Sequence, residues 1–461
     1  MIIRAYHLPG FADADVAKWD ERPAGGARLL IPHLQPGDVQ QVAARLREAQ
    51  ARLRERSVDS IVDAIDRVAH RLLDRGDPLR TAADAALPPL TGYSPAMIEH
   101  ILDGMAADWR RPALERLLEA ELDGIDILDR PVERRGRRVI AMPHPLLLHV
   151  FAGNIPGVAV TSLVRALLVR AASLGKTAEG EPLLPALFAQ ALAQQDSTIG
   201  DALAVTYWSG GDQAIEDVAF READAIVVYG GAQALGDIRR RAPAHVPILD
   251  HGPRLSVGFI ARDAFADGIP ADRVARDVAR AVATFDQQGC VSPHAVYVES
   301  SIADAVRFGR LVVEALAELE ADLPRGALTA DEAAAVRETR TRAEFAAFAG
   351  GTTELLSPPD APFTLVLHQA TGFEPSCLQR TIHLYAVPAI DDALAVLAPH
   401  RALLQSAAVA GGDDALLCRI AQSGFTRITS FAHMAWPDPA GHHDGRGPLC
   451  ELVRLVAVEA P

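Results

Sequence analysis

The stretch LLLHVFAGNIPGVAVTSLVRALLVRAA (146–172) decides the fold class predicted for this chain. Its first residues form a continuous apolar run, which is typical of a strand buried on both faces. The apolar spacing of the remainder predicts a helix with Pro156 in its first turn. Strands and helices keep alternating through SLGKT (173–177), LAVTYWSG (203–210) and AIVVYGG (225–231). This alternation predicts an α/β fold built on a parallel sheet with crossover helices, as in nucleotide-binding domains.

A second alternating region begins at LSVGFIARD (255–263) and continues through the strand HAVYVES (294–300) and a helix to about residue 323. Upstream, residues 38–75 have helical apolar spacing and predict two amphipathic helices. The segment VERRGRRVIAMPHP (132–145) predicts a β-hairpin that turns at Arg135-Gly136. Its run of arginines is either a solvated hairpin or a site for a polyanion.

Composition narrows the possible functions. With 461 residues, about two or three domains are expected, and the content of 49% hydrophobic and 23% charged residues is that of a globular protein. The net charge of −15 argues against a nucleic-acid partner. The first residues lack the apolar core of a signal peptide and no run reaches the length of a membrane span, so a cytoplasmic location is predicted. The cysteines form no CxxC pair, which excludes a zinc knuckle and a dithiol redox site.

The segment DQQGCVSPH (286–294) places Cys290 after a glycine, at the end of a long amphipathic stretch. A single cysteine is either a small buried apolar residue or a nucleophile. Gly289 and Pro293 predict a turn, which is where a thiolate can accept an acyl group. The C-terminal end of the preceding helix would raise the pKa of a thiol there. Activation therefore has to come from a nearby cation, a bound nicotinamide ring or a reactive substrate.

Six groups of residues between about 150 and 450 occur in one order, while no strand-to-helix turn carries the GxGxxG fingerprint. They are GNIPG (153–157), YWSGGD (207–212), VVYGG (227–231), HGPRLS (251–256), DQQGCVSPH (286–294), and the tail GFTRI (424–428) with HHDGRGPL (442–449). This order resembles the aldehyde dehydrogenase superfamily, whose cofactor fold lacks that fingerprint. It resembles more closely the acyl-CoA reductases of the LuxC family, the fatty-acid reductase component of bacterial bioluminescence.

The resemblance implies an aldehyde-dehydrogenase-like fold, with two parallel-sheet Rossmann-type domains and a small β oligomerisation element. We expect residues 1–131 and 146–254 to form the cofactor-binding domain and residues 255–432 to form the catalytic domain. Residues 132–145 and 433–461, which end in the strand-like ELVRLVAVE, would form the oligomerisation element of a homo-oligomer.

Three residues acquire catalytic roles from the resemblance. Cys290 is the expected nucleophile, and Asn154 forms an oxyanion hole with the backbone N–H of the cysteine; taken alone, Asn154 would cap the following helix. Glu374 in GFEPS takes an acidic role near the nicotinamide ribose or as a base; taken alone, it is an exposed loop glutamate. Asp250 stands nearest to the position where aldehyde dehydrogenases carry the glutamate that activates hydrolytic water. Its shorter side chain favours reduction of the acyl-enzyme over hydrolysis.

A nicotinamide cofactor is expected at the ends of the first group of strands. The family uses the position of Lys176 to bind the adenosine ribose, and Glu179 would accept hydrogen bonds from ribose hydroxyls. The resemblance implies NADPH, whereas repulsion between Glu179 and a 2′-phosphate favours NADH, so NAD stays possible. The full set of cofactor-binding candidates is Lys176, Thr177, Glu179, Gly210, Gly230 and Gly231.

The predicted reaction reduces a long-chain acyl thioester, carried by CoA or by a carrier protein, to the aldehyde through a cysteine acyl-enzyme. The alternatives are an aldehyde dehydrogenase that forms the free acid, a cysteine acyltransferase or thioesterase that needs no nicotinamide, and a catalytically silent scaffold. No metal is predicted, because HHDG (442–445) offers three close ligands and no fourth.

Overall fold

The protein is described by a computed structural model, which covers residues 2–265 and 270–459. The chain divides into two compact units, each described here by itself. The first comprises Met1–Thr91, Ile98–Gly252 and Asp438–Pro461, and the second comprises Gly92–Met97 and Pro253–Pro437.

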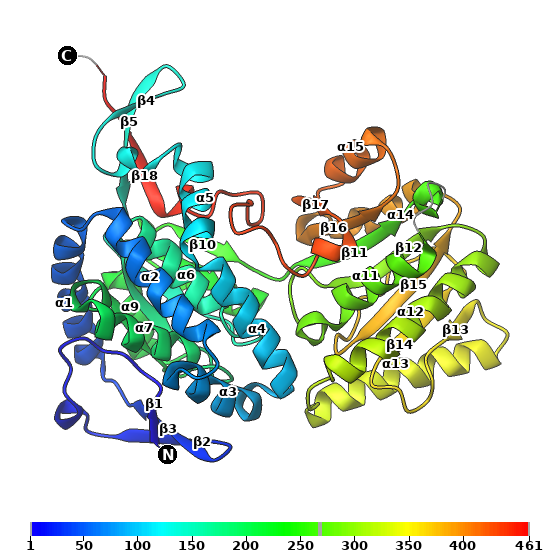
Figure 1. The fold of residues 1–461 in the computed structure, drawn as a ribbon, viewed down its shortest axis with the longest axis horizontal. Helices are drawn as coiled ribbons and strands as arrows, with labels where there is room; N and C mark the ends of the chain where they lie inside the picture. Colours follow the sequence, from blue (N-terminus) through cyan, green and yellow to red (C-terminus); the bar gives the residue numbers. More distant parts are fainter. Residues whose placement is uncertain (1, 266–269, 460–461) are drawn as a thin grey trace. The chain divides into compact units, whose positions relative to one another are not determined.

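A parallel sheet of five strands forms the centre of the first unit, in the order β10-β9-β6-β7-β8. Figure 1 labels β10 of this sheet. The strands are β6 (Leu146–Val150), β7 (Ala172–Lys176), β8 (Leu203–Thr206), β9 (Ala225–Tyr229) and β10 (Ile248–His251). The helices that follow them are α6 (Val158–Leu168), α7 (Leu184–Gln195), α8 (Ser197–Gly200), α9 (Gln213–Glu222) and α10 (Ala232–Arg241). From β6 the chain winds to β7 and β8 on one side, then crosses to β9 and β10 on the other. The winding therefore reverses between β6 and β9.

Helices from the N-terminal part of the chain complete the layers around this sheet. They are α1 (Pro36–Arg54), α2 (Val58–Leu73), α3 (Pro78–Thr91), α4 (Pro95–Asp108) and α5 (Arg111–Leu122). The two amphipathic helices predicted over 38–75 are α1 and α2, and each buries its apolar residues. Ser57 caps α2 by accepting a hydrogen bond from the Ser60 N–H, which satisfies a donor of the first turn.

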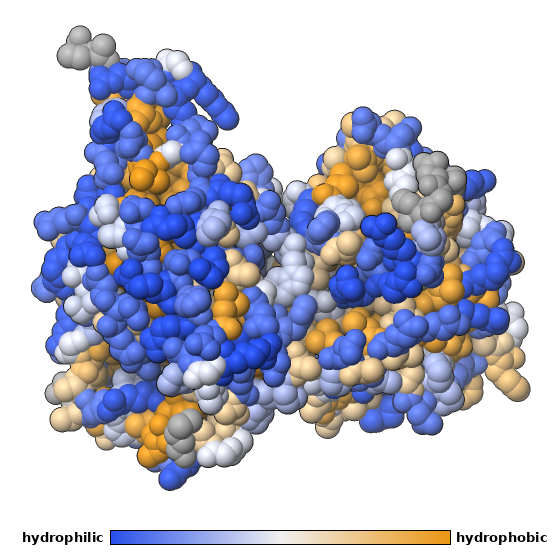
Figure 2. Space-filling view, viewed as in Figure 1, coloured by the Kyte–Doolittle hydropathy of each residue, from blue (hydrophilic) through white to orange (hydrophobic). Residues whose placement is uncertain are grey.

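Two small sheets belong to the first unit. One has the order β1-β3-β2, formed by β1 (Ile2–Arg4), β2 (Trp19–Ala24) and β3 (Ala27–Pro32). The other has the order β18-β5-β4, formed by β4 (Val132–Arg134), β5 (Arg137–Pro143) and β18 (Val453–Ala457). The predicted hairpin is present, and Arg135 and Gly136 take left-handed φ values of 51° and 73° at its turn. Figure 2 shows hydrophobic residues among hydrophilic ones on this projecting element, where Leu455 and Val456 are exposed.

The second unit contains a sheet of seven strands, in the order β13-β14-β15-β12-β11-β16-β17, parallel except for β13. The strands are β11 (Leu255–Ile260), β12 (Pro293–Glu299), β13 (Thr353–Leu355), β14 (Thr364–His368), β15 (Thr381–Val387), β16 (Leu404–Ala410) and β17 (Arg427–Thr429). The helices are α11 (Ala271–Ala283), α12 (Ile302–Asp322), α13 (Ala330–Phe348), α14 (Ile390–Leu397) and α15 (Asp414–Gln422). One apolar cluster joins the sheet to α11 and α12, and another joins it to α14 and α15.

Some elements differ from the sequence predictions. Gly157 takes a φ of 98° and α6 begins only at Val158, so the expectation that Pro156 lies in the first helical turn is wrong. The patterns did not predict α13, because its apolar residues are mostly alanines spread around the helix and only Val336, Thr339 and Ala343 are buried. Among the described residues, no helix is long and apolar enough to cross a membrane.

Candidate active site

The predicted cofactor residues gather at one edge of the five-stranded sheet. Asn154 follows the carboxyl end of β6, Lys176 ends β7, and Gly230 follows β9. In open α/β sheets, ligands bind outside the carboxyl ends of the strands, next to the point where the winding reverses. Since β6 and β9 flank that point here, the loop of Asn154 and the turn at Gly230 lie at the position where a dinucleotide is expected.

Asn154 is exposed in a loop that glycines hold close to its neighbours. A Cβ atom added at Gly153 would lie 2.8 Å from the Ala178 Cβ, and one added at Gly157 would lie 2.6 Å from the Met105 Cγ. Because Gly157 occupies the N-cap position of α6, the alternative that Asn154 caps this helix is wrong. Asn154 itself is exposed at the carboxyl ends of the strands.

Two cations and an aromatic ring meet at the ends of β7 and β8. The Nζ of Lys176 lies 5.9 Å from the centroid of the Tyr207 ring, and the guanidinium carbon of Arg22 lies 4.1 Å from the same centroid. Arg22 also donates a hydrogen bond to the carbonyl oxygen of Glu179 at 3.3 Å. Burial lowers the pKa of Lys176, and the carboxylates of Glu216 and Glu179 oppose this. Sequence reasoning missed Arg22, which β2 brings in from far along the chain and which no motif marks.

The other cofactor candidates fall into two groups. Thr177 is buried and its hydroxyl donates to the Thr206 carbonyl oxygen at 3.2 Å, so that hydroxyl is used inside the sheet. A Cβ atom added at Gly231 would meet no atom within 4 Å, and Gly230 has no contact of this kind closer than 3.7 Å. Neither glycine has a left-handed φ, so packing within this unit does not require glycine at either position. Open space beside β9 and cations beside β7 fit a bound dinucleotide.

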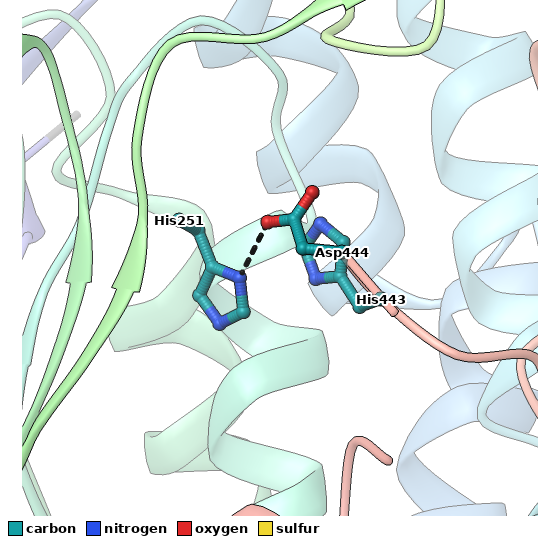
Figure 3. A group of neighbouring side chains, drawn as sticks. All are labelled: His251, His443 and Asp444. Carbon is teal, nitrogen blue, oxygen red and sulfur yellow. Dashed lines mark hydrogen bonds and ion pairs between the residues drawn. The ribbon is translucent and has the colours of Figure 1, made fainter. Parts of the chain in front are cut away.

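A cluster of ionisable side chains lies at the end of β10 (Figure 3). The Nδ1 of His251 lies 3.3 Å from an Asp444 carboxylate oxygen, and its Nε2 lies 3.6 Å from Glu451. Burial acts to lower the pKa of His251, but the two carboxylates outweigh it and the pKa is raised. The rings of His251 and His443 stack 4.3 Å apart at 8°, so their nitrogen lone pairs point along parallel planes and do not converge on one ion. The geometry fits a hydrogen-bonded charge cluster better than a metal centre.

Asp250, next to His251, is held by arginines. Its carboxylate lies 3.3 Å from Arg239 and 4.0 Å from Arg446, and its carbonyl oxygen accepts a hydrogen bond from Arg446 at 2.5 Å. The side chain that we expect nearest to the position of the hydrolytic glutamate is therefore engaged by two guanidinium groups of its own unit.

Cys290 lies in the turn between the short 3₁₀ segment η4 (Thr284–Gln287) and β12. The cysteine is exposed, while Gly289 and Val291 on either side are buried, so the alternative of a buried apolar cysteine is wrong. The Ser292 N–H donates to the Gly289 carbonyl oxygen at 2.9 Å and closes the predicted turn. The Cys290 carbonyl oxygen accepts from the Ser256 hydroxyl at 2.8 Å, which ties the turn to the start of β11.

The backbone just before this turn is strained. Phe285, Asp286 and Gln287 take left-handed φ values of 58°, 47° and 66°. A left-handed conformation costs roughly 1–2 kcal/mol for each residue that carries a Cβ atom. A second run of this kind, with φ values of 67°, 56° and 59° at Leu378, Gln379 and Arg380, precedes β15.

Buried polar bonds join the two strained runs. Arg380 donates to Asp286 at 2.7 Å and to Glu320 at 2.6 Å. The Gln287 side-chain amide donates to the Thr381 carbonyl oxygen and accepts from the Thr381 N–H, both at 2.8 Å. Burial raises the pKa of Asp286, and the Arg380 guanidinium opposes this rise. We name Asp286, Gln287, Arg380 and Thr381 the clamp; its bonds offset the backbone strain that positions the cysteine turn.

Glu374 lies in a different cluster of the second unit. It forms an ion pair with Arg342 of α13 and is close to His368 and His383, whose rings share a hydrogen bond of 2.9 Å. Burial lowers the pKa of both histidines to about 4. Glu374 is therefore more than a solvated loop glutamate, because its carboxylate forms an ion pair with Arg342.

Comparisons with known proteins agree with this architecture. Among solved structures, the chain is similar to a putative aldehyde dehydrogenase from Anabaena variabilis, with a TM-score of 0.69, 17% identity and coverage of 96% of this chain and 97% of that one. It is similar also to an NADP-dependent glyceraldehyde-3-phosphate dehydrogenase from Bacillus halodurans complexed with NADP, with a TM-score of 0.71, 17% identity and coverage of 96% and 95%. The predicted aldehyde-dehydrogenase-like α/β fold is confirmed.

Sequence relatives identify the family. The chain is 25% identical over 476 residues to the long-chain acyl-protein thioester reductase of Photobacterium phosphoreum, covering 100% of this chain and 92% of that protein. It is 27% identical over 383 residues to long-chain acyl-protein thioester reductase 2 of Photobacterium leiognathi, covering 80% and 76%. The family model of acyl-CoA reductase (LuxC) matches residues 53–455. This chain therefore belongs to the acyl-CoA reductase (LuxC) family, as the order of its motifs predicted.

Proposed function

We propose that this chain reduces a long-chain acyl thioester to the aldehyde with a nicotinamide cofactor, through an acyl-enzyme on Cys290. The observation that carries the proposal is an exposed thiol on a turn whose backbone is tied down on both sides. Membership of a reductase family and the aldehyde-dehydrogenase-like fold support chemistry at the aldehyde level. Since the relatives are named for acyl-protein thioesters, the donor thioester is carried by a protein or by CoA.

In the first half-reaction, the Cys290 thiolate attacks the thioester carbonyl carbon and forms the new C–S bond. The C–S bond to the donor breaks, and the departing thiolate takes up a proton. We propose that the Asn154 side-chain amide and the Cys290 backbone N–H donate hydrogen bonds to the carbonyl oxygen and stabilise the negative charge that develops on it. Asn154 and Cys290 belong to different compact units, and this pairing rests on the family resemblance.

In the second half-reaction, a bound reduced nicotinamide supplies the hydride that adds to the acyl carbon. The acyl group on Cys290 becomes a thiohemiacetal. When its C–S bond breaks, the aldehyde leaves and Cys290 is again a thiolate. Lys176 and the open backbone at Gly230 and Gly231 are the residues that would hold the cofactor.

We assign NADPH as the working reductant, with NADH as the alternative. Arg22 and Lys176 beside the Tyr207 ring offer positive charge and a stacking surface, which suit an adenine ring with a 2′-phosphate. Glu179 opposes this choice by repulsion. The test is direct binding of both reduced cofactors to unmodified protein, Arg22→Gln and Glu179→Gln. We expect Arg22→Gln to weaken NADPH about tenfold, as for the loss of one charge-assisted contact, and to leave NADH within about twofold. Equal losses for both cofactors would exclude Arg22 from phosphate recognition.

A product assay separates the proposed reaction from its alternatives. Acyl-CoA of several chain lengths and an acylated carrier protein are each incubated with NADPH or NADH, and cofactor absorbance, aldehyde and free acid are quantified. The proposal predicts that cofactor oxidation matches aldehyde formation. Thioester cleavage without cofactor oxidation would favour an acyltransferase or thioesterase. No turnover together with an unreactive Cys290 would favour a silent scaffold.

The direction of the reaction follows from Asp250. Its carboxylate faces Arg239 and Arg446, so we propose that it activates water poorly and that the acyl-enzyme waits for hydride or for a thiol. Aldehyde and NADP should be consumed slowly unless CoA is added as the acceptor. Rapid release of free acid without CoA would favour the aldehyde dehydrogenase alternative.

We also propose a homo-oligomer formed through the hairpin element. The edge strand β18 exposes Leu455 and Val456, and such edges are usually covered. Light scattering of unmodified protein and of Leu455→Asp tests this proposal. A monomer of the unmodified protein at micromolar concentration would contradict it.

A further inference from the structure

The cysteine turn is connected to the edge strand β17 by a chain of hydrogen bonds. The hydroxyl of Ser256 donates to the Cys290 carbonyl oxygen at 2.8 Å and accepts from the Ser406 N–H at 3.1 Å. Ser406 in β16 is the register partner of Arg427, the first residue of β17. The Arg427 guanidinium lies 3.5 Å from the Ser406 hydroxyl. Residues distant in the sequence therefore bring one arginine next to the turn that carries the thiol.

Arg427 is held by neutral groups. Its guanidinium donates to the carbonyl oxygens of Met434 at 2.9 Å and His433 at 2.5 Å, and to the Thr429 hydroxyl at 3.4 Å. Among the ion pairs of the described residues, none joins Arg427 to a carboxylate. These neutral backbone and hydroxyl groups therefore hold the guanidinium in place.

The Arg427 guanidinium is close enough to the Cys290 side chain for the two to interact electrostatically. Burial lowers the pKa of Arg427, and the negative charge of the Cys290 side chain opposes this effect. An interaction that favours the guanidinium cation beside a thiolate favours the thiolate equally, because the coupling between two titrating groups is reciprocal. A nearby cation is one of the arrangements that make cysteines reactive.

We propose that Arg427 is the cation that stabilises the thiolate form of Cys290. The inference rests on the proposed role of Cys290 as the acyl acceptor and names the group that prepares it. It also resolves an electrostatic difficulty. The turn comes after helix α11 in the chain, and the sequence predicts that the C-terminal end of that helix raises the pKa of a thiol. Arg427 acts only by stabilising the charge of the thiolate, so it is a positioning residue. It takes no part in the bonds that form and break.

The test measures how the alkylation rate of Cys290 depends on pH, followed by mass spectrometry of its peptide with iodoacetamide as the probe. Arg427→Gln removes the charge but keeps donors for the carbonyl oxygens, and Arg427→Lys keeps the charge. Arg419→Met is the matched control, since it removes an exposed arginine that pairs with Asp391 in the same unit. We expect the midpoint of the rate profile to rise by about one pH unit or more in Arg427→Gln and to change little in the other two. An unchanged midpoint in folded Arg427→Gln would overturn the proposal.

A second measurement needs no substitution, so it still decides if both Arg427 variants fail to fold. At one pH, the ratio of the rates with anionic iodoacetate and neutral iodoacetamide is compared between native Cys290 and the same thiol in urea-unfolded chain. A fixed cation beside the native thiol raises the ratio several-fold, because it attracts the anionic reagent. A ratio no higher in the native protein would contradict the inference. Both tests read the thiol alone, so an absence of acyl reduction would count against the proposed function and leave this inference standing.

Discussion

In the five-stranded sheet, the candidate residues lie at the carboxyl ends of the strands, which we call the first edge. In the seven-stranded sheet, Cys290 lies at the amino end of a strand, which we call the second edge. In the first unit, Asn154, Lys176 and Gly230 follow the carboxyl ends of strands, where the chain runs into helix N-termini. Those N-termini carry partial positive charge, which favours a phosphate-bearing cofactor. In the second unit, Cys290 precedes the amino end of β12, after the C-terminal end of α11. Helix polarity therefore favours an anion at the first edge and gives no such support at the second. The second edge consequently depends on Arg427 and on the clamp.

The largest loss of activity is expected from removal of the Cys290 thiol at the second edge. Cys290→Ala removes the proposed acyl acceptor, so reduction should be lost while unfolding temperature and cofactor binding stay unchanged. Unmodified protein incubated with acyl-CoA and no nicotinamide should carry the acyl mass on the peptide of Cys290. An acyl mass on Cys377, Cys418 or Cys450 would assign the nucleophile to another position.

The next prediction removes the support of the cysteine turn. Arg380→Met leaves Asp286 buried without its cation, and loss of one partner of a buried ion pair costs about 3–5 kcal/mol. Denaturant unfolding measures this loss. Arg276→Met, which removes an exposed i,i+4 ion pair with Asp272, is the control and should cost less than about 1 kcal/mol. A similar cost in both variants would show that the clamp does not stabilise the turn.

A smaller effect is expected at the first edge. Asn154→Ala removes one donor to the developing oxyanion, and kcat should fall by about 10²–10³-fold with KM for the thioester within a few fold. Steady-state kinetics give both constants. Thermal unfolding is the control, because Asn154 does not occupy the cap of α6. A lower unfolding temperature with normal kcat would assign Asn154 a structural role only.

Two glycines at the first edge are expected to differ in role: Gly157 in stability and Gly230 in cofactor binding. Gly157→Ala should lower the free energy of unfolding by about 1–2 kcal/mol for its left-handed φ of 98°, with a further loss from the contact with Met105. Gly230→Ala should leave stability within about 0.5 kcal/mol, because its φ is not left-handed and the added Cβ has room. It should instead weaken cofactor binding measured by titration. Unchanged cofactor affinity would exclude close approach of the cofactor at Gly230.

The smallest effect concerns one histidine beside each loop, of which His149 is buried and His294 is half-buried. Both ring nitrogens of His149 in β6 are hydrogen-bonded to serine hydroxyls, at 2.9 Å and 3.1 Å, whereas the Nδ1 of His294 in β12 has no partner among the described residues. Burial lowers the pKa of His149 to about 3 and that of His294 to about 4. NMR titration of the ring protons should show both rings neutral at pH 5.5, and His251 titrating above its ordinary value of about 6.5.

The sign of the stability change follows from these pKa directions. Below about pH 6.5 the unfolded chain binds protons that folded His149 and His294 exclude, so these residues lower stability as the pH falls. His251 acts in the opposite sense: its contribution is present below about pH 6.5 and is lost as the pH rises through its folded pKa. Ring protons of His149 or His294 that titrate between pH 5.5 and pH 6.5 would contradict the two lowered pKa values.

Local rules predicted the first edge well and the second edge poorly. The buried strands at 146–150 and 225–229 were readable because a parallel strand covered on both faces is apolar throughout. The turn at Cys290 was readable from its glycine and proline. No local rule predicts three left-handed residues without a glycine, because each is unfavourable alone and persists only through bonds made to a second run about 90 residues later.

The sequence by itself determined the class of fold and the family, and it predicted the nucleophile, because apolar periodicity and the order of short motifs are properties of neighbouring residues. Only the tertiary structure showed which arginines lie beside the candidate site residues of each edge. Arg22 reaches Lys176 through a small N-terminal sheet, and Arg427 reaches the cysteine turn through the register of β16 and β17. An arginine has the same side chain wherever it stands in the sequence. Its effect on a thiol or a phosphate depends on distance and burial, which only the packing of distant strands sets.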